Sequence, residues 1–148
     1  MPKFDQEKLL KLVSEFRKSV HRLQKLAEIG QKKFLSDPDK IGSAKYHFIV
    51  AIESSIDMCN HIISRNGYRV PEDYADTFKV MGEVGAFDLS FSEQLIKMAK
   101  FRNRLVHIYW EIDDTRIYAI LEGHLGDFKN FLNSIASFLE WKNANFNT

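Results

Sequence analysis

Four side chains between residues 102 and 109 could together act on a phosphate group: Arg102, Asn103, His107 and Tyr109. A histidine can take or give a proton near neutral pH, because its unperturbed pKa is about 6.5. An arginine stays charged and can hold two phosphate oxygens at once. Asn103 adds an amide and Tyr109 adds a hydroxyl. These residue types could therefore move protons and stabilise developing charge without a metal ion.

A helix from Ser90 to about Tyr109 is expected to carry these side chains. Ser90 and Glu93 match a capping box, which marks a helix start. The apolar residues that follow have helical spacing and form one stripe: Leu95, Met98, Ala99, Leu105 and Val106. Arg102 falls in the middle of this stripe, although the solvated face is the usual place for an arginine. At 100° per residue, Tyr109 lies on the Arg102 side of the helix.

The directions of Arg102 and His107 suggest that one chain does not complete a site. On an ideal helix these two side chains diverge by about 140°. Asn103 and His107, in contrast, are neighbours four residues apart. Two chains packed through this helix could bring two such sets into one cleft, so we expect a homodimer with two-fold symmetry.

Two carboxylates on another helix are natural partners for Arg102. Glu53 and Asp57 lie one turn apart beside an apolar stripe, where a charged group needs a partner or water. A purely structural alternative stays open. In that alternative, Arg102 only neutralises one of these carboxylates, His107 joins a hydrogen-bond network, and Tyr109 belongs to the core.

Four more helices are predicted around residues 9–27, 37–66, 71–82 and 118–139. Apolar residues recur at intervals of three and four in each of them, and Gly30 is expected to end or bend the first. Seven Gly and three Pro in 148 residues leave few breaks, and 45% hydrophobic content suits one packed core. The sequence therefore predicts a single all-α domain over residues 1–148, a five-helix antiparallel up-and-down bundle.

The composition excludes several classes of site. The single cysteine, Cys59, rules out a disulfide within the chain and a cysteine-based zinc site. Phosphate-binding Gly-rich loops, Gly-x-Ser-x-Gly and His-Glu-x-x-His are all missing, and none of the five histidines has a Glu three residues before it. We expect no metal site and no cofactor.

Charge and hydropathy favour a cytoplasmic protein with no membrane segment. The formal net charge is +1, but residues 1–36 hold nine Lys and Arg against four Asp and Glu. Such a run is most simply a solvated helix face. No apolar stretch approaches the roughly 18 residues of a membrane span, and the N-terminus lacks the apolar core of a signal peptide.

The spacing Arg-x-x-x-x-His-x-Tyr, with Asn directly after the Arg, resembles the motif of the HEPN superfamily. The similarity is specific to the HepT toxins of HepT-MntA toxin-antitoxin pairs, and Arg102, Asn103, His107 and Tyr109 occupy the matching positions. Further segments over roughly residues 40–140 are similar to the same family: 51–57, 68–71 and 117–118.

This resemblance implies an all-helical homodimer that acts as a metal-independent endoribonuclease. Arg102 and His107 would be catalytic, Asn103 would orient the substrate or His107, and Glu53 and Asp57 would support the arginine. Cations on the motif helix would bind RNA, namely Lys97, Lys100 and Arg104. By analogy with other HEPN nucleases, tRNA is the favoured substrate and mRNA remains open.

The resemblance also implies a partner and a modification. A cognate MntA-type nucleotidyltransferase would silence the toxin by transferring AMP to Tyr109, which adds negative charge and bulk. Two other functions remain possible. The chain could be a non-catalytic HEPN protein that binds nucleotide or substrate for a nucleotidyltransferase, or a plain helical adaptor.

Overall fold

The structure is a computed structural model that describes residues 1–142 as a bundle of helices. This part of the chain holds seven α-helices and one short 3-10 helix, so the all-α prediction is confirmed and the predicted count of five helices is wrong. The α-helices are α1 (Gln6–Glu28), α2 (Gln31–Leu35), α3 (Pro38–Asn66), α4 (Tyr74–Glu83), α5 (Leu89–His107), α6 (Asp114–Gly123) and α7 (Gly126–Phe138), and the 3-10 helix is η1 (Tyr109–Glu111).

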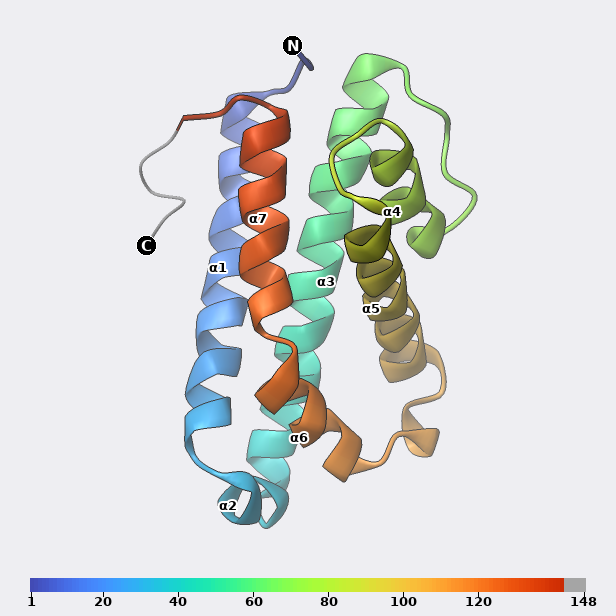
Figure 1. The fold of residues 1–148 in the computed structure, drawn as a ribbon. Coiled ribbons are helices and arrows are strands. Elements are labelled where there is room, and N and C mark those ends of the chain that lie inside the picture. Colours follow the sequence, from blue (N-terminus) through green and yellow to red (C-terminus); the bar gives the residue numbers. More distant parts are fainter. Residues whose placement is uncertain (143–148) are drawn as a thin grey trace.

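Two long antiparallel helices, α1 and α3, form the frame of the bundle (Figure 1). Asp37 caps α3 by accepting hydrogen bonds from the N–H groups of residues 39 and 40, and Pro38 follows at the first helical position. Gly67 ends the helix in the left-handed region with φ 64°, where glycine has no steric penalty. Gly30, at φ 90°, separates α1 from α2. The predicted start and stop of the second long helix are thus confirmed.

Aromatic side chains of α7 fill the space between α1, α3 and α4. Phe128 lies edge-on to Phe16 of α1, with ring centroids 5.7 Å apart. Phe131 contacts Phe16 at 5.8 Å and Phe78 of α4 at 6.2 Å. These rings are all buried. The core of the bundle therefore depends on aromatic contacts between segments far apart in the sequence.

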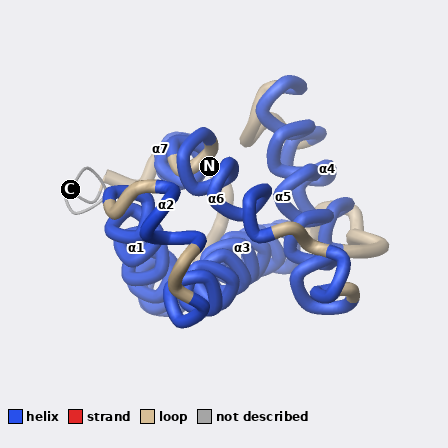
Figure 2. Tube along the Cα trace, turned by 90° about the horizontal axis from the view of Figure 1, so that it is seen from below, coloured by secondary structure: helices blue, strands red, loops and turns tan. Residues whose placement is uncertain are grey.

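A second hairpin, α4 with α5, packs on the other side of α3. Viewed from below, α3 lies between α1 and this hairpin (Figure 2). Two helix starts differ from the sequence prediction. Asp73, and not Pro71, precedes α4, and its carboxylate accepts a hydrogen bond from residue 76. Asp88 caps α5 in place of Ser90, because its carboxylate accepts from the N–H of Phe91 at 2.8 Å.

Two predicted helices are shorter than their sequence patterns suggest. Leu105 is the last buried residue of α5, which ends at His107, so Tyr109 lies beyond the helix in η1. Past Leu105, the side chains of Val106, Tyr109 and Trp110 are exposed, and a helical turn with little packing has little to stabilise it.

The predicted helix over 118–139 is divided into α6 and α7 near Gly123 and Gly126, which both have low helix propensity.

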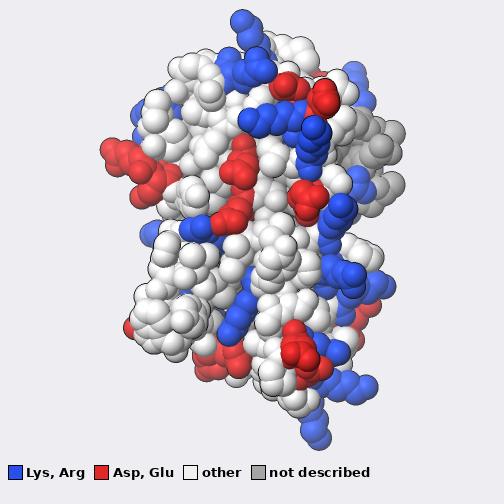
Figure 3. All heavy atoms as spheres, turned by 180° about the vertical axis from the view of Figure 1, so that it is seen from behind, with Lys and Arg blue, Asp and Glu red and all other residues white. Residues whose placement is uncertain are grey.

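The basic side chains of α1 lie along one edge of the molecule (Figure 3). Several of them pair with carboxylates one turn away on the same helix, such as Lys11 with Glu7 and Lys18 with Glu15. This arrangement agrees with a solvated helix face. None of the helices between residues 1 and 142 combines the length and apolar character that a membrane span requires.

Truncation of Phe131 tests the aromatic core. Phe131→Ala removes a fully buried ring that contacts α1 and α4, and should lower the free energy of unfolding by about 3–5 kcal/mol. Leu89→Ala is the control, because Leu89 is 78% exposed and should change stability little. Urea unfolding followed by circular dichroism gives both values. Equal stability of the two variants would contradict this description of the core.

Candidate functional site

Arg102 occupies the predicted position within the apolar face of α5. Its side chain is only 12% exposed and forms an ion pair with Glu53 of α3. The guanidinium donates to the same carboxylate oxygen, Oε1, from Nε at 3.0 Å and from Nη2. A nearly buried cation requires such a partner, because an unpaired charge in this environment is costly. The prediction of a carboxylate partner on the second long helix is confirmed for Glu53.

Asn103 and Tyr74 complete the surroundings of the guanidinium. Nη1 of Arg102 donates to Oδ1 of Asn103 at 3.1 Å. The ring of Tyr74, at the start of α4, lies 4.7 Å from the guanidinium carbon and supplies a cation–π contact. Tyr74 was not among the site residues predicted from the sequence. The contact depends on how α4 and α5 pack, for which the sequence gives no local signal.

Asp57, the other carboxylate predicted beside Arg102, lies elsewhere. It lines a groove between α1 and α3 together with Lys8, His61 and Arg65. Partial burial, and secondarily the charge of Glu53, raise the pKa of Asp57 above its ordinary value of 3.8. Glu53 therefore supports the arginine directly, whereas Asp57 faces a different part of the surface.

His107 is the last residue of α5 and its side chain is exposed. At 100° per residue it shares the outer face of the helix with Lys100 and Arg104, and Lys97 continues this face two turns earlier. All three cations are exposed. We call Lys97, Lys100, Arg104 and His107 the basic face of α5. Arg102 points to a different side, so the structure does not bring the arginine and the histidine of one chain together.

Two exposed aromatic residues lie two and three positions after His107. Tyr109 is 61% exposed and its ring lies edge-on to that of Trp110, at 5.4 Å between centroids. The sequence prediction placed Tyr109 on α5 on the side of Arg102, but the helix ends at His107 and the tyrosine lies in η1. Its hydroxyl is therefore available at the surface.

The described part of the chain, residues 1–142, contains no group of three or more His, Cys, Asp or Glu side chains placed to hold a metal ion. On α5, His107 is the side chain that can exchange protons near neutral pH, and Arg102 is a permanent cation that can stabilise negative charge.

Neutralising Glu53 tests the ion pair. Glu53→Gln should lower the free energy of unfolding at pH 7 by about 1–2 kcal/mol, because it removes a charge-assisted hydrogen-bond acceptor from Arg102. Asp57→Asn is the matched control. Its raised pKa means that the folded state disfavours the carboxylate, so this variant should be more stable at pH 7.

The gain from Asp57→Asn should vanish below about pH 4, where the carboxyl group is protonated in both the folded and the unfolded state. Urea unfolding at both pH values measures these differences. A Glu53→Gln protein as stable as the wild type would mean that the ion pair contributes nothing.

Comparison with known proteins finds relatives that match most of this chain. An mRNA nuclease HepT from Shewanella oneidensis is 24% identical over 127 residues, which cover 86% of this chain and 95% of that protein. A putative RNase from Archaeoglobus fulgidus is 26% identical over 118 residues, covering 80% of this chain and 87% of the relative.

A solved structure has the same fold. It is the tri-AMPylated HEPN toxin of Shewanella oneidensis in complex with an MNT antitoxin, with a TM-score of 0.81, 24% identity, and coverage of 87% of this chain and 96% of the other. The sequence profile described as ribonuclease HepT-like matches residues 16–135, most of the chain. The protein therefore belongs to the HepT-like ribonuclease family of HEPN proteins.

Proposed function

We propose that this protein is a metal-independent endoribonuclease toxin with Arg102 and His107 as its catalytic residues. The proposal rests on the hydrogen bonding of Arg102, whose guanidinium is nearly buried but still has N–H groups without an acceptor among the described residues. Its bonds to Glu53 and Asn103 engage three of its five N–H groups, counted over the described residues, and leave one on each terminal nitrogen. A phosphate could accept both.

The chemistry of RNA cleavage fits these two side chains. The 2′-hydroxyl must lose a proton, the phosphorane must be stabilised, and the leaving oxygen must gain a proton. His107 is exposed and can exchange protons with the substrate. Arg102 keeps its charge throughout and is held in place by Glu53 and Tyr74, so it is organised before the phosphate arrives.

Two copies of the chain would complete the site. Arg102 is recessed between α3 and α4, whereas His107 is exposed at the end of α5 on another side of the helix. A two-fold interface that includes the end of α5 would place the histidine of one copy near the arginine of the other. The homodimer is thus part of the proposal, with the whole chain forming one domain.

The basic face of α5 would bind the RNA strand. Its exposed cations would contact phosphates without reading the base sequence. The name of the Shewanella relative, an mRNA nuclease, makes mRNA the first substrate to test, and tRNA is the second.

Replacement of His107 tests the catalytic assignment. His107→Ala should lower the rate of RNA cleavage by about 100-fold or more, because general acid–base catalysis contributes at least this factor. The assay uses purified protein, mRNA and tRNA substrates, and EDTA, which should leave wild-type activity intact. His21→Ala, which removes an exposed histidine on α1, should cut as fast as the wild type. Equal rates for His107→Ala and wild type would remove His107 from the mechanism.

Regulation by a nucleotidyltransferase forms the second part of the proposal. Tyr109 lies two residues after His107 and is exposed, and the toxin in the similar solved structure is AMPylated and bound to an MNT antitoxin. AMP on Tyr109 would bring negative charge and bulk close to the RNA-binding face and would thereby repel the substrate.

Tyr109→Phe tests this modification, because it removes one hydroxyl and almost no volume. Incubation of wild-type protein with a cognate MntA-type transferase and ATP should add AMP, seen by intact-mass spectrometry, and should stop RNA cleavage. Tyr109→Phe should still cleave but should no longer be modified or silenced. Tyr46→Phe is the control, since Tyr46 is also 61% exposed. AMP-sized additions that persist on Tyr109→Phe would refute the assignment.

A further inference from the structure

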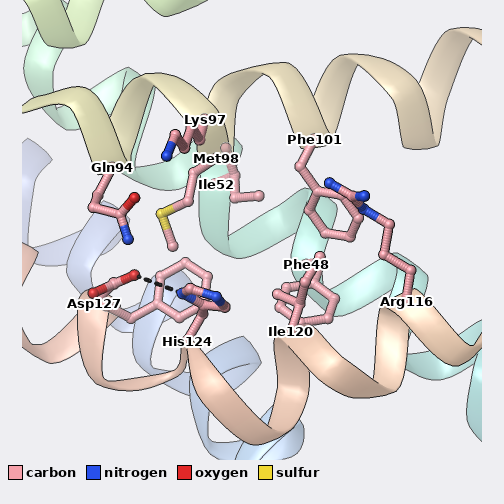
Figure 4. Close-up of a pocket in the computed structure, with 11 residues that line it drawn as sticks. Phe48, Ile52, Gln94, Lys97, Met98, Phe101, Arg116, Ile120, His124 and Asp127 are labelled. Atoms are coloured by element: carbon pink, nitrogen blue, oxygen red, sulfur yellow. Dashed lines mark hydrogen bonds and ion pairs between the residues drawn. The ribbon is translucent and has the colours of Figure 1, made fainter.

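A pocket outside the proposed catalytic pair lies between α5 and the corner where α6 meets α7. Its volume is about 140 Å³ and it reaches the side of α3. Figure 4 shows its side chains converging from α5 on one side and from α6 and α7 on the other. Nothing in the catalytic proposal uses this pocket.

The inner part of the pocket is apolar. Its floor consists of the buried side chains of Phe48, Ile52 and Phe128, and its walls include Met98 and Phe101. An engineered apolar cavity of about 150 Å³ holds one benzene molecule, so a cavity of this volume suits a single six-membered ring. Aromatic walls also favour a flat ring, because they can stack on its face.

The mouth of the pocket is polar and mostly cationic. Lys97 of α5 and Arg116 of α6 are exposed, and neither forms an ion pair with another residue in the range 1–142. The two cations lie at opposite ends of the pocket (Figure 4), so each could hold an anionic group attached to a ring that lies between them. A nucleotide within an RNA strand, which has a phosphate on each side of its flat base, has this combination of charge and shape.

Hydrogen-bonding groups face one another across one end of the pocket. Gln94 extends from α5 toward Asp127 and His124 (Figure 4). Nδ1 of His124 and Oδ2 of Asp127 are 3.4 Å apart. An amide and a carboxylate offer both donors and acceptors, which the edge of a pyrimidine base requires.

We propose that this pocket binds a pyrimidine nucleotide of the RNA substrate, with the base against the apolar floor and the phosphates on its two sides held by Lys97 at one end of the pocket and by Arg116 at the other (Figure 4). The assignment to RNA rests on the proposed function. Lys97 belongs to both the pocket and the basic face of α5, and His107 lies ten residues further along the helix, about 15 Å away. A strand bound along this face would reach both, so the pocket would select a pyrimidine at a fixed offset from the cut.

Binding of mononucleotides tests the pocket independently of cleavage. NMR titration of the full chain with CMP or UMP should give saturable shifts of the Gln94 side-chain amide and the His124 ring. AMP and GMP should bind about tenfold more weakly, because a purine is too large for the cavity.

Three variants define the site in this titration. The double variant Lys97→Gln with Arg116→Gln should weaken CMP binding about tenfold, and Ile120→Phe should abolish it by filling the pocket. Lys129→Gln, an exposed cation of α7 outside the pocket, is the matched control and should bind as the wild type does. Thermal melting checks that each variant is folded. Non-saturating shifts, or equal affinity for CMP and AMP, would overturn the proposal.

Cleavage of RNA then tests the source of the nucleotide. In an RNA that the wild type cuts, replacing pyrimidines by purines one position at a time should slow cleavage about tenfold at one offset from the cut. The Lys97→Gln, Arg116→Gln variant should lose this dependence. CMP binding without any such offset would mean that the pocket takes free nucleotides and would refute the RNA assignment. If the wild type cuts no RNA, the proposed function fails, while the CMP titration still decides whether the pocket binds pyrimidines.

Discussion

The ion pair between Arg102 and Glu53 is the constraint on which the rest of the site depends. A guanidinium in the apolar face of α5 is tolerated only because a carboxylate of α3 accepts from it twice. The pair ties α5 to α3, and Tyr74 of α4 covers the guanidinium. The bundle thus fixes the position of a permanent cation while leaving N–H groups available to a ligand. A lysine could not replace this geometry, since it lacks the planar fork of donors.

Much of the fold could be predicted from apolar periodicity, and the failures have identifiable causes. The boundaries of α3 agree with the predicted range 37–66, because the residues that start and end this helix, Asp37, Pro38 and Gly67, act locally. The starts of α4 and α5 were misplaced because several residues near each start could serve as caps, and packing selects among them. The break between α6 and α7 was missed because the apolar residues keep their spacing of three and four through it. The helical backbone is nevertheless interrupted there.

The candidate site shows the same division between local and tertiary information. The position of Arg102 and its need for a carboxylate partner could be predicted, because a charge in an apolar stripe must be neutralised. The sequence could not show that this partner is Glu53 and not Asp57. Both lie on one flank of α3, and only the packing of α1 and α5 separates them. The pocket between α5 and the corner of α6 and α7 could not be predicted from the sequence either, because its residues come from four helices.

The central claim is that Arg102 of one copy works with His107 of another, and subunit complementation tests it most directly. Arg102→Ala and His107→Ala proteins, each shown by light scattering to be dimeric, are mixed under conditions that exchange subunits and are then assayed on RNA. A site shared between copies predicts that the mixture regains roughly a quarter of wild-type activity, because half of the dimers are mixed and each mixed dimer has one intact site. A mixture as inactive as either variant alone would contradict the shared site.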